Sequence, residues 1–435
     1  MLPDGNFNYA WYDMLKSASN EKEVIIDSIK KIIAGNKFDS CLEIGMGTSP
    51  FFANGMTSLF EDYTIVEKHI AFPETVSGLT FLQGDWEEIS LQRKFDVIIA
   101  SHVLYYFKEK AAAFEKMVGA LSKNGILIVV VNGRDGDYGA TKKFFFEQIG
   151  IDYQFTYDVL TSWLQDKHVL EFSVPSAISF DSYESLYESL SLSFDQHQDH
   201  YRRMRNEMLA FFRNTLREHA FIINQKIFVL QHAPEKWKFL IRHPDYEIRT
   251  GGMRILARDG VFSPDRQITW STHFLLQQLP DVKGRDVLDI GCGTGIIAIE
   301  CALQEARRVV AADISGDAVR NTLLNVGINH VEGKVKVLQS DLFEKVEGRF
   351  DYIFGNLPIL EDVWELTESP VRILRYFLTG CRNFIKPGGK AYFTWASFGP
   401  VGEVVALLSD LGCSYDKRVA TFDEVEWYFF EVTFG

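Results

Sequence analysis

Two glycine-rich segments, each preceded by an acid, are the strongest chemical signal in this chain of 435 residues. They read CLEIGMGTSP at residues 41–50 and VLDIGCGTGI at residues 287–296. A short apolar run followed by an acid and glycines is typical of a buried strand that turns into a helix. Glycine has no Cβ, so a ligand can lie directly against the backbone of such a turn.

The same series of residues follows each glycine-rich segment. Acids recur in one order: Glu43, Glu67 and Asp85 in the first half, and Asp289, Asp313 and Asp341 in the second. The first two pairs are each separated by 246 residues. Apolar strands that alternate with helical stretches predict parallel sheets covered by helices on both faces. The repeat therefore predicts two doubly wound, Rossmann-like α/β domains in tandem, at 1–234 and 235–435, with a small hairpin at the start of the second.

Composition narrows the class of protein. The net charge is -14 and both halves are acidic, so we expect a small-molecule substrate and regard nucleic acid as an unlikely partner. The longest apolar run, ILIVVV at 126–131, is too short to cross a bilayer, and the N-terminus lacks the pattern of a signal peptide. These features predict a soluble, cytoplasmic protein. The five cysteines are scattered and predict neither a metal site nor a disulfide framework.

The residues of the two glycine turns indicate which class of ligand they bind. Neither turn has the G-x-G-x-x-G pattern of dinucleotide-binding folds, and neither has the G-K-[ST] of a Walker loop. The remaining pattern, an acid, the glycines and two later acids, resembles the class I S-adenosylmethionine-dependent methyltransferases in both halves. The resemblance implies that the glycine turn contacts the amino acid and ribose of the cofactor, that Glu67 and Asp313 bind the ribose, and that Asp85 and Asp341 read adenine.

By position in that pattern, the expected cofactor-binding residues are Glu43, Gly45, Gly47, Glu67, Asp85, Trp86, Asp289, Gly291, Gly293, Gly295, Asp313, Asp341, Leu342 and Asn356. The transferred methyl group is already activated in this cofactor. The protein mainly has to hold a nucleophile in line with the S–CH₃ bond and exclude water. No metal is expected.

The fourth predicted strand of the second half ends in FGNLPIL, with Asn356 and Pro358 as candidate catalytic residues. This loop is similar to the Asn-Pro-Pro-aromatic loop of methyltransferases that act on the glutamine of release factors or on nucleobase amino groups. In those families the Asn accepts hydrogen bonds from the target nitrogen. Ile359 stands where an aromatic would stack on the substrate and is a candidate substrate contact. DGVFSP at 259–264 resembles a segment of ribosomal RNA guanine methyltransferases.

The first half is similar to the histamine N-methyltransferase family over most of residues 1–230. That resemblance rests on GNFNYAWYDMLKSASNE at 5–21, the stretch at 103–145 and FIINQKIFVL at 221–230. It implies an aromatic lid and further substrate contacts: Tyr9, Trp11, Tyr12, Glu21, His102 and Asn224. Asn20 falls where that family has its amine-binding glutamate, and Glu21 is adjacent. His102 is a candidate general base.

Two functions follow from these patterns. The first is a bifunctional methyltransferase acting on a small-molecule nucleophile, with nitrogen as the favoured acceptor. The alternative is a single active C-terminal N-methyltransferase acting on RNA or protein glutamine, with a degenerate N-terminal copy that serves as a binding module.

Overall fold

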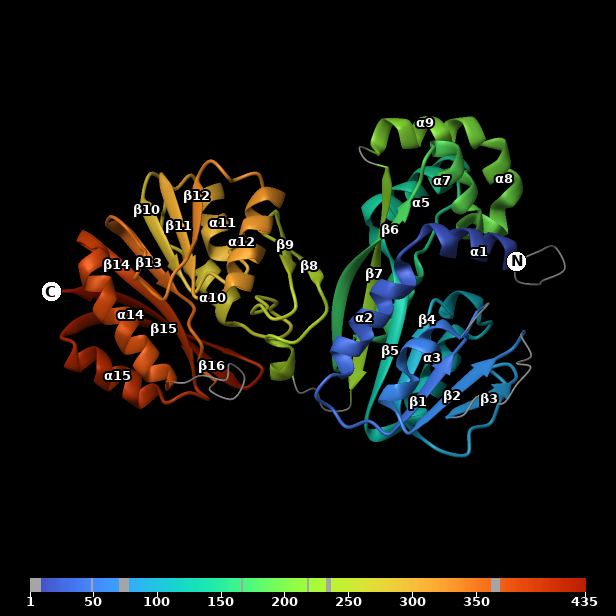
Figure 1. The fold of residues 1–435 in the computed structure, drawn as a ribbon, viewed down its shortest axis with the longest axis horizontal. Coiled ribbons are helices and arrows are strands. Elements are labelled where there is room, and N and C mark those ends of the chain that lie inside the picture. Colours follow the sequence, from blue (N-terminus) through green and yellow to red (C-terminus); the bar gives the residue numbers. More distant parts are fainter. Residues whose placement is uncertain are drawn as a thin grey trace. The chain divides into compact units, whose positions relative to one another are not determined.

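The computed structural model describes residues 9–47, 50–69, 78–165, 167–216, 219–231, 236–360 and 368–435. The chain forms two compact units, residues 1–234 and residues 235–435. Figure 1 shows the ribbon of both units, and each is described here by itself.

Unit 1 is a seven-stranded sheet covered by helices. Its strands are β1 (Ser40–Ile44), β2 (Asp62–Glu67), β3 (Leu79–Gln83), β4 (Phe95–Ser101), β5 (Leu121–Asp135), β6 (Val169–Ser179) and β7 (Ala220–Gln231). Its helices are α1 (Tyr9–Ala18), α2 (Glu21–Ile33), α3 (Phe51–Met56), α4 (Lys110–Gly119), α5 (Gly136–Gln148), α6 (Thr156–Trp163), α7 (Tyr183–Ser189), α8 (Gln198–Arg203) and α9 (Arg205–Thr215). Short 3₁₀ turns are η1 (Thr57–Leu59), η2 (Leu104–Tyr106) and η3 (Ser191–His197).

Unit 2 repeats this sheet. Its strands are β10 (Asp286–Ile290), β11 (Arg308–Asp313), β12 (Val335–Gln339), β13 (Phe350–Gly355), β14 (Ile385–Ala396), β15 (Cys413–Phe422) and β16 (Val425–Phe434). Its helices are α10 (Ser271–Gln277), α11 (Ile296–Leu303), α12 (Gly316–Ile328), α14 (Pro370–Phe384) and α15 (Val401–Asp410). The 3₁₀ turn η4 (Lys236–Phe239) and the antiparallel hairpin of β8 (Tyr246–Thr250) and β9 (Met253–Ala257) precede them.

The two sheets have the same topology. The strand order is β3-β2-β1-β4-β5-β7-β6 in unit 1 and β12-β11-β10-β13-β14-β16-β15 in unit 2. The first five strands of each sheet are parallel, and β7 and β16 run antiparallel to their neighbours. Parallel strands buried on both faces explain the continuous apolar runs of the sequence. The expected fold, two doubly wound, Rossmann-like α/β domains in tandem, is confirmed.

The units differ after their fifth parallel strand. In unit 2, β15 and β16 form a direct hairpin, whereas in unit 1 helices α7, α8 and α9 are inserted between β6 and β7. Figure 1 shows these three helices together at one end of β6 and β7. A separate aromatic core joins them to α5 and to that end of the strands, and it includes Phe145, Phe194, Tyr201 and Phe212. The insertion therefore belongs to the folded body of unit 1.

Candidate functional site

The glycine turns lie where β1 and β10 end. Gly45 and Gly291 have φ angles of +78° and +73°, which glycine adopts freely and other residues rarely do. A Cβ on Gly45 would lie 2.3 Å from Cγ1 of Val103, and one on Gly291 would lie 3.4 Å from Cδ2 of Leu357. Val103 follows His102 just beyond β4, and Leu357 follows Asn356 just beyond β13. In both units, therefore, the residue that follows the candidate substrate contact, His102 or Asn356, packs against the first glycine of the turn.

The acids at the ends of β2 and β11 are held against the glycine turns by backbone hydrogen bonds. The Glu67 carboxylate accepts from the N–H groups of Met46 (2.9 Å) and His69 (2.8 Å). The Asp313 carboxylate accepts from the N–H groups of Gly293 (2.9 Å) and Ser315 (2.9 Å). Each carboxylate oxygen keeps a lone pair, so both acids can still accept from the two hydroxyls of a ribose.

The acids inside β1 and β10 are buried and incompletely hydrogen-bonded. Glu43 and Asp289 are each 1 % exposed. Burial raises the pKa of each to about 7, because a charged carboxylate is disfavoured away from water. Oε1 of Glu43 and Oδ2 of Asp289 have no hydrogen-bond partner among the described residues. Hydrogen bonding by the backbone N–H groups of Ala53 and Ala298, in the helices that follow the two turns, opposes the rise in the pKa of Glu43 and Asp289.

The third pair of acids differs between the units. In unit 1, Asp85 forms an ion pair with Lys68 (2.7 Å) and accepts from the Glu87 N–H (3.0 Å). In unit 2, Asp341 is exposed, and no bond of its carboxylate to another described residue is found. The Trp86 indole is buried and donates to the carbonyl of Ala113, so only its backbone can face a cofactor. Leu342, which follows Asp341, is half-buried and has a φ of +41°.

Asn356 begins the loop after β13, and its side chain is held in one orientation. Its Nδ2 donates to Oγ of Ser271 (3.3 Å) and to Oγ1 of Thr272 (2.9 Å), and its Oδ1 accepts from Oγ1 of Thr394 (2.7 Å). Both amide N–H groups are therefore used, while Oδ1 keeps one lone pair. Such an oxygen can accept a hydrogen bond from an N–H of an incoming substrate. The sequence did not indicate the three hydroxyls, because they lie far from Asn356 along the chain.

The remainder of this loop packs toward the core. Leu357 is buried over Gly291, and Pro358 and Ile359 are half-buried. A Cβ on Gly399 would lie 2.7 Å from Cγ2 of Ile359 and 2.7 Å from Nε1 of Trp395. Ile359 thus fills the space beside Gly399, where a bulkier aromatic would need rearrangement. In DGVFSP, Phe262 lies beside the turn, with its Cβ 4.0 Å from a Cβ built on Gly293.

His102 occupies in unit 1 the position that Asn356 occupies in unit 2, directly after the fourth parallel strand. Its φ of +56° is uncommon for a residue other than glycine, and such conformations concentrate at functional sites. Its Nε2 lies 3.6 Å from Oε1 of Glu21 and its Nδ1 lies 3.4 Å from the Tyr105 hydroxyl. Burial lowers the pKa of His102, which favours the neutral imidazole.

The structure places two of the predicted substrate contacts, Glu21 and Asn224, relative to His102. Glu21 faces His102, whereas the side chain of the preceding Asn20 accepts from the Ala177 N–H (2.8 Å). Gln225 is fully buried and donates to Glu21 (3.3 Å) and to Ser176 (2.8 Å). Asn224 precedes it on β7 and its Nδ2 lies 3.2 Å from a Cβ built on Gly136. Adjacent strand residues point to opposite faces, so Gln225 lies on the face of β7 that joins Glu21 and His102, and the substrate contact of Asn224 stays a prediction.

The predicted aromatic lid falls on α1. This helix lies against α7 and β6. The side chains of Tyr9, Trp11 and Tyr12 lie outside the described residues, so their role as a lid stays a prediction.

In each unit, the helix that precedes the first strand of the sheet has its first residues close to the residue that follows the fourth strand. In unit 1, α2 begins with Glu21 and Lys22, and Glu21 faces His102. In unit 2, α10 begins with Ser271 and Thr272, and both hydroxyls bind Asn356. The two sites thus share one plan with different chemistry, ionisable in unit 1 and neutral in unit 2. Lys22, like Gln225, was missed in the sequence.

Two negative findings apply to the described part of the chain. No group of three or more His, Cys, Asp or Glu side chains is arranged to hold a metal ion. Within the same residues, no helix has both the length and the apolar character that a bilayer span requires.

Taken together, each unit has a glycine turn at the end of its first strand and, at the end of the next strand, an acid with free lone pairs held against that turn. This arrangement fits S-adenosylmethionine and is that of a class I methyltransferase. Comparison with known proteins agrees. The "Methyltransferase small domain" family matches residues 252–412, and the "Methyltransferase domain" family matches residues 67–144.

The sequence is 33% identical over 177 residues to a protein of Methanocaldococcus jannaschii provisionally named a protein N5-glutamine methyltransferase; this match covers 38% of the chain and 87% of that protein. It is 29% identical over 160 residues to the ribosomal RNA small subunit methyltransferase C of Escherichia coli, covering 37% of the chain and 45% of that relative. The solved 16S rRNA N2 G1207 methyltransferase of T. thermophilus, in complex with AdoMet and guanosine, aligns over 93% of the chain and 91% of its own, with 16% identity and a TM-score of 0.34.

The chain belongs to the S-adenosylmethionine-dependent methyltransferases, and S-adenosylmethionine is its cofactor. The family that matches residues 67–144 is a general methyltransferase domain, so the closer resemblance to histamine N-methyltransferases is not shown.

Our expectation about partners was wrong. Relatives are named for ribosomal RNA and for protein glutamine, so the acidic net charge does not make nucleic acid unlikely. The net charge was a poor guide to binding partners because it also counts acids that are not exposed on the surface. Glu43 and Asp289, for example, are buried.

Proposed function

We propose that unit 2 transfers a methyl group to a planar amide nitrogen, with the side chain of a protein glutamine as the acceptor. The observation that carries this proposal is the fixed orientation of Asn356, whose Oδ1 keeps one free lone pair beside the glycine turn. An NH₂ group that donates to this oxygen is held by an N–H bond in its own plane, so its lone pair, perpendicular to that plane, stays free for the methyl group. A neutral amide is a weak nucleophile, so alignment is the main contribution that the protein can make.

The chemistry follows from that alignment. The cofactor supplies a methyl group on a sulfonium centre. The acceptor nitrogen would form a bond to this carbon as the S–C bond breaks with its electrons left on sulfur, and one proton would pass from the nitrogen to solvent. Asn356 orients the nitrogen, Leu357 holds the loop on Gly291, and the half-buried Pro358 and Ile359 limit the access of water.

A glutamine acceptor is supported by the 33% identity to the relative provisionally named for that reaction, of which the chain covers 87%. The second candidate is the amino group of an RNA guanine, which is also planar. It is favoured by the ribosomal RNA relative and by the position of Phe262 beside the glycine turn.

The test is methyl transfer from labelled S-adenosylmethionine to glutamine-containing peptides and, separately, to ribosomal RNA. We expect labelled peptide, and a loss of about a hundredfold in rate for Asn356→Ala with unchanged cofactor affinity. The exposed Asn383 of the same unit provides the control variant, Asn383→Ala, which should retain full activity. Label in RNA alone would replace glutamine by guanine as the acceptor. Equal losses of rate and cofactor affinity would make Asn356 a cofactor or folding residue.

We further propose that unit 1 binds a second molecule of cofactor. This rests on the hydrogen bonds that hold Glu67 against its glycine turn, which repeat those of Asp313 in unit 2.

A further inference from the structure

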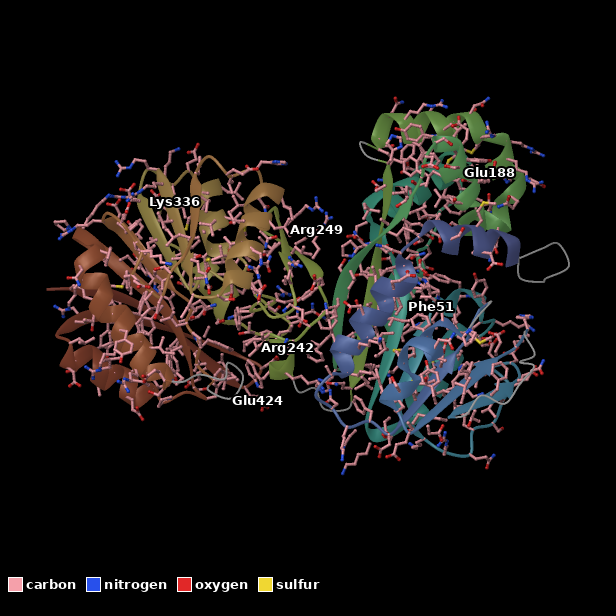
Figure 2. The ribbon with its side chains drawn as sticks, viewed as in Figure 1. Phe51, Glu188, Arg242, Arg249, Lys336 and Glu424 are labelled. Atoms are coloured by element: carbon pink, nitrogen blue, oxygen red, sulfur yellow. The ribbon has the colours of Figure 1, made fainter. Side chains whose placement is uncertain are left out.

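Lys22, the second residue of α2, has no counterpart in unit 2, where Thr272 holds the second position of α10. Its Nζ lies 4.7 Å from the ring centroid of Phe52. Phe52 belongs to the first turn of α3, which begins at Phe51 soon after the glycine turn; Figure 2 labels Phe51, and α2 and α3 pack together. The lysine therefore places a positive charge next to the start of the helix that follows the turn.

The electrostatic surroundings of Lys22 link two parts of the site. The charges that act on it are those of Glu21, which faces His102, and of Glu43, which lies in β1 just before the glycine turn. Burial lowers the pKa of Lys22, because a buried ammonium is costly unless anions surround it. Each of those two carboxylates already accepts a hydrogen bond from another side chain, Glu21 from Gln225 and Glu43 from Tyr63.

S-adenosylmethionine carries an anionic group at its amino-acid end. With its ribose bound by Glu67 as proposed, its amino-acid part would lie along the glycine turn and would end in a carboxylate. Glu67 accepts from the Met46 N–H of this turn, and Lys22 lies against Phe52 in the helix that follows it. A carboxylate beside Lys22 would gain a charged hydrogen bond, while Glu43 and Glu21 would face the cationic groups of the same ligand.

We propose that Lys22 binds the carboxylate of S-adenosylmethionine in unit 1, and that unit 2 anchors this group without a lysine. This inference rests on the proposed binding of a cofactor by unit 1, and it is independent of the acceptor of unit 2. Because Lys22 also neighbours Glu21, the bound carboxylate would fix the start of α2 against His102. Lys22 would thus connect occupancy of the cofactor site with the geometry of the acceptor site.

The test compares two ligands that differ only in the carboxylate, S-adenosylmethionine and decarboxylated S-adenosylmethionine, by calorimetry on the full-length chain. An Asp313→Ala background weakens the site of unit 2, so that binding reports on unit 1. We expect Lys22→Met to weaken S-adenosylmethionine roughly 10- to 100-fold, which is the range for a hydrogen bond to a charged group, and to change the decarboxylated ligand less than about threefold. Lys22→Arg should retain most of the affinity.

Lys30→Met provides a matched control, because Lys30 is exposed on the same helix. It should change neither affinity. If Lys22→Met does not fold, Lys22→Gln serves for the same comparison. Equal losses for both ligands, or no loss for S-adenosylmethionine, would overturn the role of Lys22 while leaving cofactor binding by unit 1 intact. Failure of the Asp313→Ala chain to bind either ligand would overturn both.

Discussion

The buried Asp289 should make the stability of unit 2 depend on pH, and replacing its carboxyl by an amide should remove that dependence. The ordinary pKa of this carboxyl is 3.8, and burial raises the pKa in the folded unit to about 7. Between these values the folded state binds more protons than the unfolded state, so the free energy of unfolding falls as the pH rises. The penalty is absent below about pH 4 and complete above about pH 7.

The size of this effect follows from the same two values. A difference of about 3 in pKa, at about 1.4 kcal/mol each, corresponds to about 4 kcal/mol at high pH, of which about 2 to 3 kcal/mol develops between pH 5 and pH 8. The amide of the Asp289→Asn variant would not titrate. The free energy of unfolding of this variant, relative to the unchanged chain, should therefore rise by about 2 to 3 kcal/mol over that range. Any constant cost of the new amide, about 1 to 3 kcal/mol for unsatisfied N–H groups, cancels in the comparison of two pH values.

Hydrogen exchange of the β10 amides measures this, because it isolates unit 2 in a chain of two units that need not unfold together. The exposed Asp416 of the same unit provides the control variant, Asp416→Asn. If the difference between Asp289→Asn and the unchanged chain is the same at pH 5 and pH 8, Asp289 is ionised in the folded state and our account of its environment fails.

Two further predictions concern the two sites. Thr272→Val and Thr394→Val each remove one hydrogen bond that orients Asn356, so each should lower the rate of methyl transfer by unit 2 about tenfold. The affinity for S-adenosylhomocysteine should change about twofold or less, and Thr272→Ser should retain activity. A loss of affinity that matches the loss of rate would contradict a positioning role. Titration of the unchanged chain with S-adenosylhomocysteine should show two sites, of which Glu67→Ala removes one and Asp313→Ala the other; a single site abolished by Asp313→Ala alone would make unit 1 a degenerate copy.

The positions that the sequence could predict are those set by local order along the chain. The acids Glu67 and Asp313 end strands, and the structure places both against their glycine turns as the spacing implied. His102 and Asn356 were recognisable because each directly follows the fourth parallel strand. These relations depend only on where a strand ends, which an apolar pattern shows well.

The contacts that could not be predicted depend on which face of a strand a residue occupies, or join residues that are distant along the chain. Asn224 and Gln225 are neighbours on β7, and only the parity of the strand decides which of them faces Glu21. Thr272 and Thr394 reach Asn356 across 84 and 38 residues of sequence. Nothing in their local sequence distinguishes them from ordinary hydroxyl residues.

With cofactor binding by unit 1 as proposed, the two glycine segments are two copies of one cofactor site beside two different acceptor sites. Of the residues proposed to contact the cofactor, both units keep the turn, the ribose acid and a buried acid with a raised pKa. The parts that meet the acceptor differ in kind. Asn356 with Ser271 and Thr272 offers neutral hydrogen bonds, which suit an uncharged planar nitrogen. His102 with Glu21 and Lys22 offers groups that can gain or lose a proton, so the acceptor of unit 1 is expected to differ from that of unit 2 in charge. This difference favours different acceptors over two identical activities, should both units prove active in the titration and methyl-transfer experiments above.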